Sequence, residues 1–525
     1  MIFLLAPFFA CTSHPPVQPA SGGPEESGLP ETPPEVNAKA LQHFLDGEML
    51  GLQGNYPMAI LEYQDALVFD PSAPAILTSL ASAYLRLGKF DRAEERLKEA
   101  LSYDPKYRGA RELLGHQYMI LGRLDQAEEQ YRLLTDFYPR ESDYRYVLAE
   151  ISLRKGNREE AQQQFWQIYD HDHRETRALG EAAEVARERK DFPFAFKAYE
   201  LLTKSDPSNV QYWRAYSELA VVLQEFSRAI SGLERLLELT RDDPRVREQL
   251  AILYYDNDDP DKAYEIFRRL RGEGHSSPAV LYYLGRIAMD KEDYDTAGKY
   301  SLELVEDHPQ EVTGYTNLAI AYINLDRSLD AINILLKARD RFPENFAVNF
   351  LLGNSYSMQK NYVLAKKSLL SALTFSPESR SAKHLLATVY NRLEEWESSD
   401  KLYRELLETD EDDSQALNNY SYTLVERGIN LELALQMARK AISLEPDNPA
   451  YLDTIGWIYF NMGDNEKAMK YIRKSLEIEG DNPVVLEHLG DILVTSHQRE
   501  EAVNYYKKAL ELDPDNERLT QKVNQ

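Results

Sequence analysis

The sequence predicts an all-α fold, a solenoid of repeated antiparallel helix pairs, and three observations carry this prediction. A period of 34 residues runs from Ala40 almost to the C-terminus. Small residues recur at two fixed positions of this period, and proline recurs near its end. A regular period of about 20 to 50 residues is typical of repeat architectures, in which each unit buries its apolar face against its neighbours.

The repeat starts keep the 34-residue step with one exception. One extra residue falls within Gly428 to Ala434, and the last two repeats then resume the step. The chain therefore holds fourteen repeats, which start at Ala40, Pro74, Arg108, Ser142, Thr176, Val210, Pro244, Pro278, Val312, Phe346, Arg380, Ser414, Pro449 and Pro483.

The eighth and twentieth positions of the repeat predict where the two helices of each pair cross. The eighth is Gly, Ala or Ser in every unit, and the twentieth is Ala in every unit except the one with Ser399. Antiparallel helices come closest where neither carries a large side chain. Larger apolar residues at spacings of three and four, such as Leu80, Tyr84 and Leu97, predict the amphipathic stripe that neighbouring pairs cover.

Proline stands at the thirty-second position of nine units, where it ends the second helix and turns the chain into the next repeat. With the small residues, this pattern resembles the tetratricopeptide repeat over residues 40–516. The resemblance implies a right-handed superhelix with a concave inner face lined mainly by the first helix of each pair. After Asn516, the polar segment 517–525 is expected to form a short capping helix.

Composition excludes several classes of function. The chain has 525 residues, 43% of them hydrophobic, and a net charge of -27 that repels nucleic-acid phosphates. Its single cysteine excludes an internal disulfide framework and cysteine-rich metal sites. No run of eighteen apolar residues occurs, so no segment is expected to span a membrane by itself.

The N-terminus resembles a bacterial lipoprotein signal. Residues 1–10 are almost wholly apolar and end in a small residue directly before Cys11, the only cysteine. The resemblance implies that Cys11 becomes the lipidated first residue of the mature chain. Thr12 is not the Asp that retains such lipoproteins in the inner membrane, which favours the outer membrane. The alternatives are an incidental thiol and a cytoplasmic protein.

The segment from residue 11 to 39 is rich in proline, glycine and serine. Such a segment buries too little apolar surface to order itself, so we expect a lipidated cysteine followed by an extended tether. The lipid and the tether together predict a chain that is anchored to a membrane and faces the periplasm.

No separate domain is left for a catalytic site, because the repeats run without a gap. His171, Asp172 and His173 lack further metal ligands in spacing, and the acidic run Glu408 to Asp413 lacks the spacing of a calcium loop. We therefore predict no enzyme activity, metal, cofactor or small-molecule substrate. An enzyme with an unrecognised site in the groove is the alternative, although the groove positions offer only scattered carboxylates.

The last three repeats carry the candidate binding site. In the resembling family, the second, fifth, ninth, twelfth and thirteenth positions face the groove. Here they combine aromatic, amide and acidic residues, a mixture that suits peptide binding because aromatic rings supply contact area and polar groups fix register. Tyr422 and Trp457 could instead pack between repeats. The candidate residues are Asn418, Tyr422, Asp453, Trp457, Phe460, Asn461, Glu487 and Asp491.

In the N-terminal two thirds, the same positions mix both charges, as in Glu150, Arg154 and Arg187, which is typical of a solvated face. The chaperone-binding members of the family pair Lys at position five with Asn at position nine. Asn354 has Phe350 instead, which disfavours a chaperone clamp. The acids Asp453, Glu487 and Asp491 favour a basic or neutral peptide.

These features predict a non-enzymatic scaffold of the bacterial cell envelope that recruits other envelope proteins or peptide segments. The membrane is reached through the lipid on Cys11, and no nucleic-acid partner is expected. The alternative is an accessory subunit of a polysaccharide-export or secretion machine.

Overall fold

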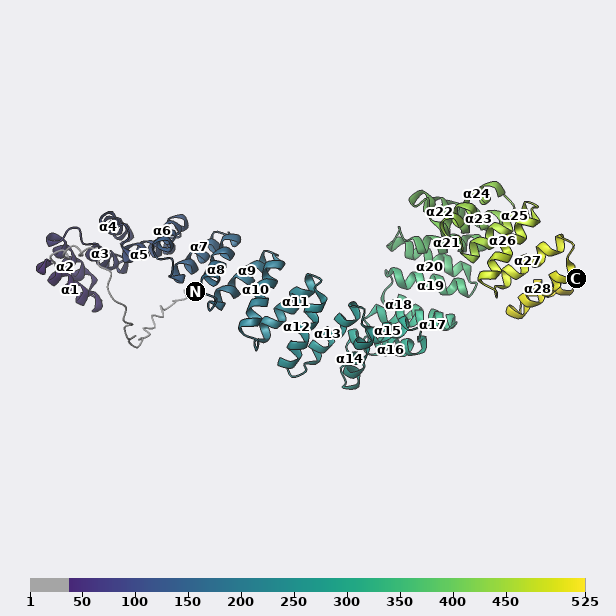
Figure 1. Ribbon diagram of the computed structural model, residues 1–525, viewed down its shortest axis with the longest axis horizontal. Coiled ribbons are helices and arrows are strands. Elements are labelled where there is room, and N and C mark those ends of the chain that lie inside the picture. The colour runs from purple at the N-terminus through teal and green to yellow at the C-terminus, as the bar shows by residue number, and fades with distance from the viewer. Residues whose placement is uncertain (1–36, 525) are drawn as a thin grey trace, which may run out of the picture. The chain divides into compact units, whose positions relative to one another are not determined.

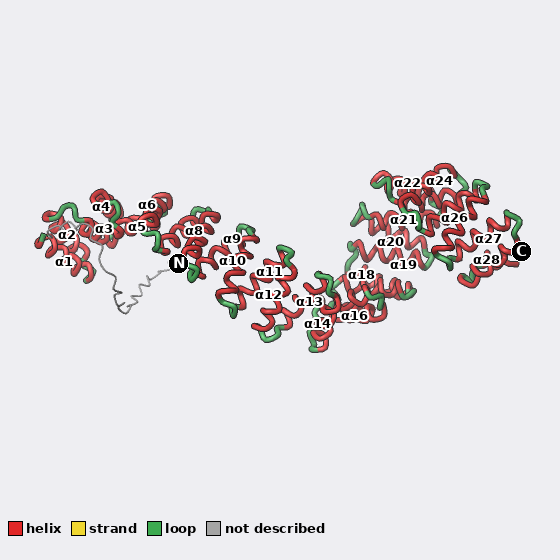
Figure 2. Tube along the Cα trace, viewed as in Figure 1, coloured by secondary structure: helices red, strands yellow, loops and turns green. Residues whose placement is uncertain are grey.

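The computed structural model describes residues 37–524, and every regular element in this range is an α-helix. The helices form two compact units, the first ending at Pro207 and the second beginning at Ser208. Within each unit, Figures 1 and 2 show successive helices joined by short loops. The predicted all-α solenoid of helix pairs is confirmed. In the described part of the chain, no helix is long and apolar enough to cross a membrane.

The first unit consists of five helix pairs. Each odd-numbered helix packs on the following even-numbered one, and the first four even-numbered helices also pack on the first helix of the next pair. Their bounds are α1 (Ala38–Leu52), α2 (Tyr56–Phe69), α3 (Pro74–Arg86), α4 (Phe90–Tyr103), α5 (Arg108–Ile120), α6 (Leu124–Phe137), α7 (Ser142–Arg154), α8 (Arg158–His171), α9 (Thr176–Glu188) and α10 (Phe192–Ser205).

The second unit continues the pattern with nine pairs and one further helix. The bounds are α11 (Val210–Val222), α12 (Phe226–Leu239), α13 (Pro244–Asp256), α14 (Pro260–Gly272), α15 (Pro278–Asp290), α16 (Tyr294–Asp307), α17 (Val312–Asn324), α18 (Ser328–Arg341), α19 (Phe346–Met358), α20 (Tyr362–Phe375), α21 (Arg380–Arg392), α22 (Trp396–Thr409), α23 (Ser414–Glu426), α24 (Leu431–Leu444), α25 (Pro449–Asn461), α26 (Asn465–Ile478), α27 (Pro483–Thr495), α28 (Arg499–Leu512) and α29 (Glu517–Asn524).

Helix α1 begins two residues before the first period. Asn37 caps it, because its side-chain oxygen accepts the backbone N–H groups of Lys39 and Ala40. Residues 38 and 39, which the prediction placed in the tether, therefore belong to α1. Residues 1–36, which include the predicted signal and Cys11, lie outside the described residues.

The crossing of each pair occurs at the two small positions. Every alanine at the twentieth position is fully buried, and so is Ser399, whose hydroxyl donates to the carbonyl of Ala387 at 3.0 Å. That hydrogen bond satisfies the one polar side chain at the twentieth positions. At Gly456, an added Cβ would lie 2.7 Å from Cγ1 of Ile472 and 3.2 Å from the carbonyl oxygen of Ala468. The helices leave no room there for a side chain.

The turn inside every pair uses a left-handed residue at the fifteenth position. In α25–α26, Gly463 has φ 84°, and the N–H of Asp464 bonds back to the carbonyl of Tyr459 at 2.9 Å. The turn after α23 has a second left-handed residue, Asn430 with φ 50°, following Gly428 with φ 64°. This four-residue turn holds the extra residue of the sequence. The fifteenth positions are Gly54, Gly88, Gly122, Gly156, Lys190, Gln224, Asp258, Glu292, Asp326, Lys360, Glu394, Gly428, Gly463 and His497.

Helix α29 covers the last pair of the second unit. Leu519 is buried on it, and Val523 packs against the same apolar cluster. The helix packs on α28 and brings two basic side chains, Arg518 and Lys522, toward α27. A solenoid needs such a cover because its terminal pair has no further neighbour.

Candidate functional site

The eight predicted residues lie on α23, α25 and α27, the first helices of the last three pairs. We call the surface that they form the C-terminal wall. These helices pack side by side, α23 on α25 and α25 on α27. Side chains at equivalent repeat positions therefore come within reach of one another.

An aromatic stack forms the centre of the C-terminal wall. The Trp457 ring lies on His488, with 3.9 Å between ring centroids, and on Phe460, with 4.9 Å. Its Nε1–H donates to Oε1 of Glu426 at 3.1 Å, and the Asn461 amide donates to the Trp457 carbonyl at 2.9 Å. Trp457 and Phe460 are half-buried and Asn461 is exposed. The stack is thus a fixed apolar surface with polar groups at its edge.

Asp453 contacts this stack through His488. Its Oδ1 lies 2.8 Å from Nδ1 of His488, and both side chains are buried. The contact orients the imidazole ring that Trp457 covers. Asp453 therefore positions the aromatic surface and does not itself face a partner.

Glu487 and Asp491 are paired with the chain's own cations. Glu487 is buried and receives Arg518 at 2.7 Å and Lys522 at 2.6 Å, while Asp491 receives Lys522 at 2.6 Å and the Tyr506 hydroxyl at 2.6 Å. Burial tends to raise the pKa of Glu487, but Arg518 and Lys522 outweigh it and hold this pKa below its usual range. Burial, followed by the Asp491 carboxylate, raises the pKa of Tyr506.

These pairings change the electrostatics expected of the wall. Two carboxylates face two cations from α29, and the third carboxylate is bound to His488. These three acids therefore give the wall no preference for a basic peptide.

Tyr422 borders a pocket of about 220 Å³ between α21, α22 and α23. Burial raises the pKa of its hydroxyl, and the carboxylates of Glu426 and Asp453 raise it further. Asn418 lies beneath the surface and is buried. The lining includes residues that sequence reasoning missed: Asn391, Arg392, Trp396 and Glu426.

The missed residues had a signal in the repeat. Asn391 and Arg392 are at the twelfth and thirteenth positions of their unit, and Glu426 is at the thirteenth of the next. Those positions were already assigned to the groove by the resemblance. His488 stands at a sixth position, and only the stacking of α27 on α25 places its ring against Trp457.

The candidate residues thus divide into two groups. Tyr422, Trp457, Phe460 and Asn461 are at least partly exposed on the wall. Trp457 and Phe460 belong to the aromatic stack, and Asn461 lies beside it. The remaining four support the wall through buried or internally paired side chains: Asn418, Asp453, Glu487 and Asp491.

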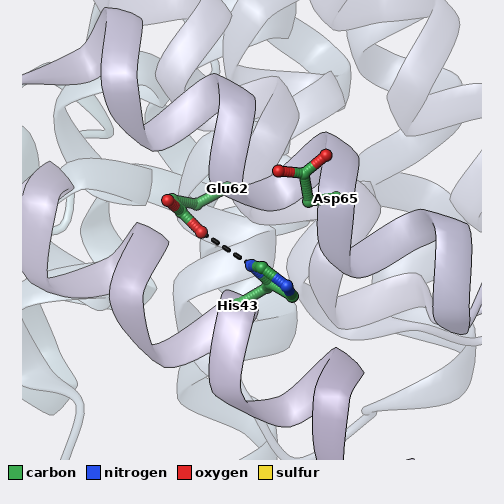
Figure 3. A group of neighbouring side chains, drawn as sticks. All are labelled: His43, Glu62 and Asp65. Carbon is green, nitrogen blue, oxygen red and sulfur yellow. Dashed lines mark hydrogen bonds and ion pairs between the residues drawn. The ribbon is translucent and has the colours of Figure 1, made fainter.

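A second polar cluster lies on the first pair of the first unit. Figure 3 shows His43 of α1 beside Glu62 and Asp65 of α2, and Nδ1 of His43 is 2.8 Å from Oε2 of Glu62. Its three ligand atoms lie within 4.8 Å of one another. The observed contact is that of a hydrogen-bonded His–Glu pair.

The residues weighed as metal ligands have other partners. His173 bonds through Nδ1 to the carbonyl of Tyr169 at 2.9 Å, and Asp172 pairs with Arg174 at 2.8 Å. In the acidic run, Asp413 accepts the N–H of Ala416 at the start of α23 and lies 2.8 Å from Arg380 and 2.9 Å from His384. This run is a helix-capping turn.

Asp413 makes stability depend on pH. Burial tends to raise its pKa, but the Ala416 N–H, Arg380 and His384 outweigh it and hold the pKa below its usual value. Because the folded pKa is depressed, the stabilisation is present above the unfolded pKa of about 3.9 and is lost as pH falls through the folded pKa.

Replacing Asp413 with Asn is expected to lower the free energy of unfolding at neutral pH by about 2 kcal/mol, with a difference from wild type that shrinks as pH falls below about 4. Urea unfolding followed by circular dichroism between neutral and acidic pH measures this difference. Asp515→Asn, at an exposed position, is the control. Equal pH dependence in both variants would contradict the assignment.

Comparison with known proteins places the whole repeat region in one family. A family profile described as "Tetratricopeptide repeat" matches residues 167–269 and 245–515. A second profile with the same description matches residues 88–151, and one described as "TPR repeat" matches residues 47–88.

Curated relatives share part of the chain. A BBSome complex member BBS4 homolog of Drosophila melanogaster is 24% identical over 218 residues, 41% of this chain and 44% of that protein. The TPR repeat-containing protein PA4667 of Pseudomonas aeruginosa is 25% identical over 193 residues, 35% of this chain and 31% of that protein. The matched region is less than half the length of each relative.

Solved structures align over most of the chain, but with low TM-scores. The APC/C hetero-tetramer Cut9-Hcn1 aligns with a TM-score of 0.41 and 14% identity over 93% of this chain and 96% of that chain. Yeast Tom70 aligns with a TM-score of 0.35 and 16% identity over 92% of this chain and 94% of that chain.

Proposed function

Because the chain belongs to the tetratricopeptide repeat family, whose repeats form scaffolds for binding other proteins, we propose that its C-terminal wall binds an extended segment of a partner protein. The proposal is that of a non-enzymatic scaffold. The observation that carries it is the stack of Trp457 on His488 and Phe460. A fixed aromatic surface gives contact area with little entropy left to lose on binding.

The surroundings of the stack suit a peptide main chain. Asn461 and Glu426 are exposed at its edge, and Tyr422 borders the neighbouring pocket. Amide and carboxylate groups beside aromatic rings bind backbone N–H and carbonyl groups and so fix the register of an extended segment.

We further propose that the scaffold acts at the bacterial cell envelope. The support is the sequence around Cys11, an apolar segment directly followed by the only cysteine and then by a proline-rich segment. Lipid on Cys11 would hold the chain at the outer membrane, facing the periplasm. Its partners would then be other envelope proteins.

Replacing Trp457 with alanine is expected to abolish capture of the partner. The test is crosslinked affinity capture of the tagged full-length protein from the native membrane fraction. Trp457→Phe keeps a stacking ring and is expected to retain a larger part of the capture. Leu329→Ala, at a residue that is 64% exposed, is the control. Undiminished capture by Trp457→Ala would refute binding at this wall.

The anchor is tested separately with Cys11→Ser. We expect the wild type in the membrane fraction and the variant in the soluble fraction, because the serine hydroxyl does not accept the lipid. Metabolic labelling with a fatty-acid analogue should mark only the wild type. Identical fractionation of both proteins without labelling would contradict lipidation and would leave the binding test unaffected.

A further inference from the structure

The outer side of α1 exposes a row of large apolar residues. Leu41, Leu45, Met49 and Leu52 are 44%, 50%, 57% and 84% exposed. At about 100° per residue, they fall within one narrow sector of the helix. We call this surface the α1 face. A contiguous apolar patch of this kind marks an interaction site.

Equivalent repeat positions show what normally covers this face. Met49 is at the tenth position of its unit. In every pair that has a preceding pair in the same unit, the residue at the tenth position is at most 6% exposed. These residues are Ala83, Gln117, Ile151, Val185, Leu253, Ile287, Ala321, Ser355, Val389, Thr423, Ile458 and Ile492.

The preceding pair provides this cover. Gln117 on α5 donates to the carbonyl of Phe90 in α4 at 2.9 Å, and Thr423 on α23 accepts a hydrogen bond from Asn391 on α21. The part of the α1 face around Met49 is therefore the surface on which the preceding pair packs elsewhere within each unit, whereas Leu41 and Leu52 stand at second and thirteenth positions, which are not buried in any pair.

The charged residues at the edges of the α1 face indicate which charge a helix bound there would carry. Asp46 flanks the row on one side and Glu48 on the other. Asp46 accepts only the amide of Gln42, and Glu48 the hydroxyl of Tyr63, within the described residues. Neither carboxylate has a lysine or arginine partner there. Each edge of the face therefore carries a carboxylate, and Lys39, on the same side as Asp46, lies over the Phe69 ring with its Nζ 5.3 Å from the centroid.

We propose that the α1 face binds an amphipathic helix of a partner protein whose apolar stripe is flanked by lysine or arginine. The apolar stripe covers the exposed row of α1, and the basic flanks pair with Asp46 and Glu48. A second copy of this chain is a poorer occupant, because two α1 faces would bring like charges together. This site is separate from the C-terminal wall and does not depend on its function.

The test uses a synthetic amphipathic helical peptide of about 20 residues, with leucines along one face and lysines beside them. A twin peptide carries glutamate in place of each lysine. Fluorescence anisotropy with the full-length protein at low and high salt measures both affinities. We expect the lysine peptide to bind at least tenfold more tightly at low salt, with a preference that falls as salt rises.

Met49→Glu is expected to weaken the lysine peptide at least tenfold, and hydrogen exchange should show protection of α1 on binding. The variant should fold normally, because Met49 is exposed. The control is Val363→Glu, at a residue 64% exposed in the second unit. Equal affinities for both peptides, or no loss in Met49→Glu, would overturn the proposal.

A photoreactive residue at position 49 of the purified protein identifies any internal occupant. A covalent dimer would mean that a second copy covers the α1 face. A crosslink to residues 1–36 of the same chain would mean that its own N-terminal segment does so. Either product would replace the proposed partner helix, whereas an uncrosslinked monomer that still binds the lysine peptide supports it.

Discussion

Replacing Phe267 with alanine is expected to lower the free energy of unfolding of the second unit by about 3–5 kcal/mol. Phe267 is fully buried on α14 and stacks on Tyr283 of α15 with ring centroids 5.3 Å apart. It therefore joins two successive pairs. Removing the ring leaves a cavity that rigid helices fill only in part.

The loss should be local at first. In a solenoid, each pair contacts only its neighbours, so stability is a sum of repeat and interface contributions. Hydrogen exchange should therefore accelerate around α13–α16 before it does near α27. Leu329→Ala, at an exposed residue of the same unit, is the control and should change the unfolding free energy by less than about 0.5 kcal/mol. Equal losses in the two variants would contradict this packing.

Gly456→Leu is expected to destabilise the second unit by about 1–3 kcal/mol or more, the range for overpacking a filled core. The first atom of the new side chain would already lie 2.7 Å from Ile472, with the Ala468 carbonyl behind it. The helices α25 and α26 would have to separate. Because α25 carries Trp457, the wall would be displaced as well.

Urea unfolding and partner capture measure the two consequences of Gly456→Leu. Gly272→Leu is the matched control, since no atom lies within 4 Å of a Cβ added at Gly272. We expect little loss of stability and unchanged capture for this control. A Gly456→Leu variant as stable as the wild type would mean that the eighth position does not set the crossing distance.

The fold followed from the sequence because its main determinants are periodic. The small residues at the eighth and twentieth positions can be read directly from the amino-acid sequence, and they are the residues at which the two helices of each pair cross. The left-handed turn is less visible. Lys190, Gln224 and Glu394 adopt positive φ where other units use glycine, because the cooperative packing of the two flanking helices closes the turn.

The candidate site was predictable in part. Repeat positions placed Trp457 and Phe460 together on the wall, as the structure has them. The ion pairs of Glu487 were not predictable, because the cations that pair with it come from α29, which lies outside the repeats. His488 was missed because contacts between rings depend on how successive helices pack, and the sequence of a single repeat does not show this packing.

The most direct test of partner binding places a photoreactive residue at position 461, on the exposed Asn461 beside Trp457. The full-length protein is irradiated in its native envelope, with the same residue at position 329 as the control. A partner in contact with the C-terminal wall should give one discrete crosslinked product at 461 that is missing at 329. No product at 461, or the same products at both positions, would contradict partner binding at this wall.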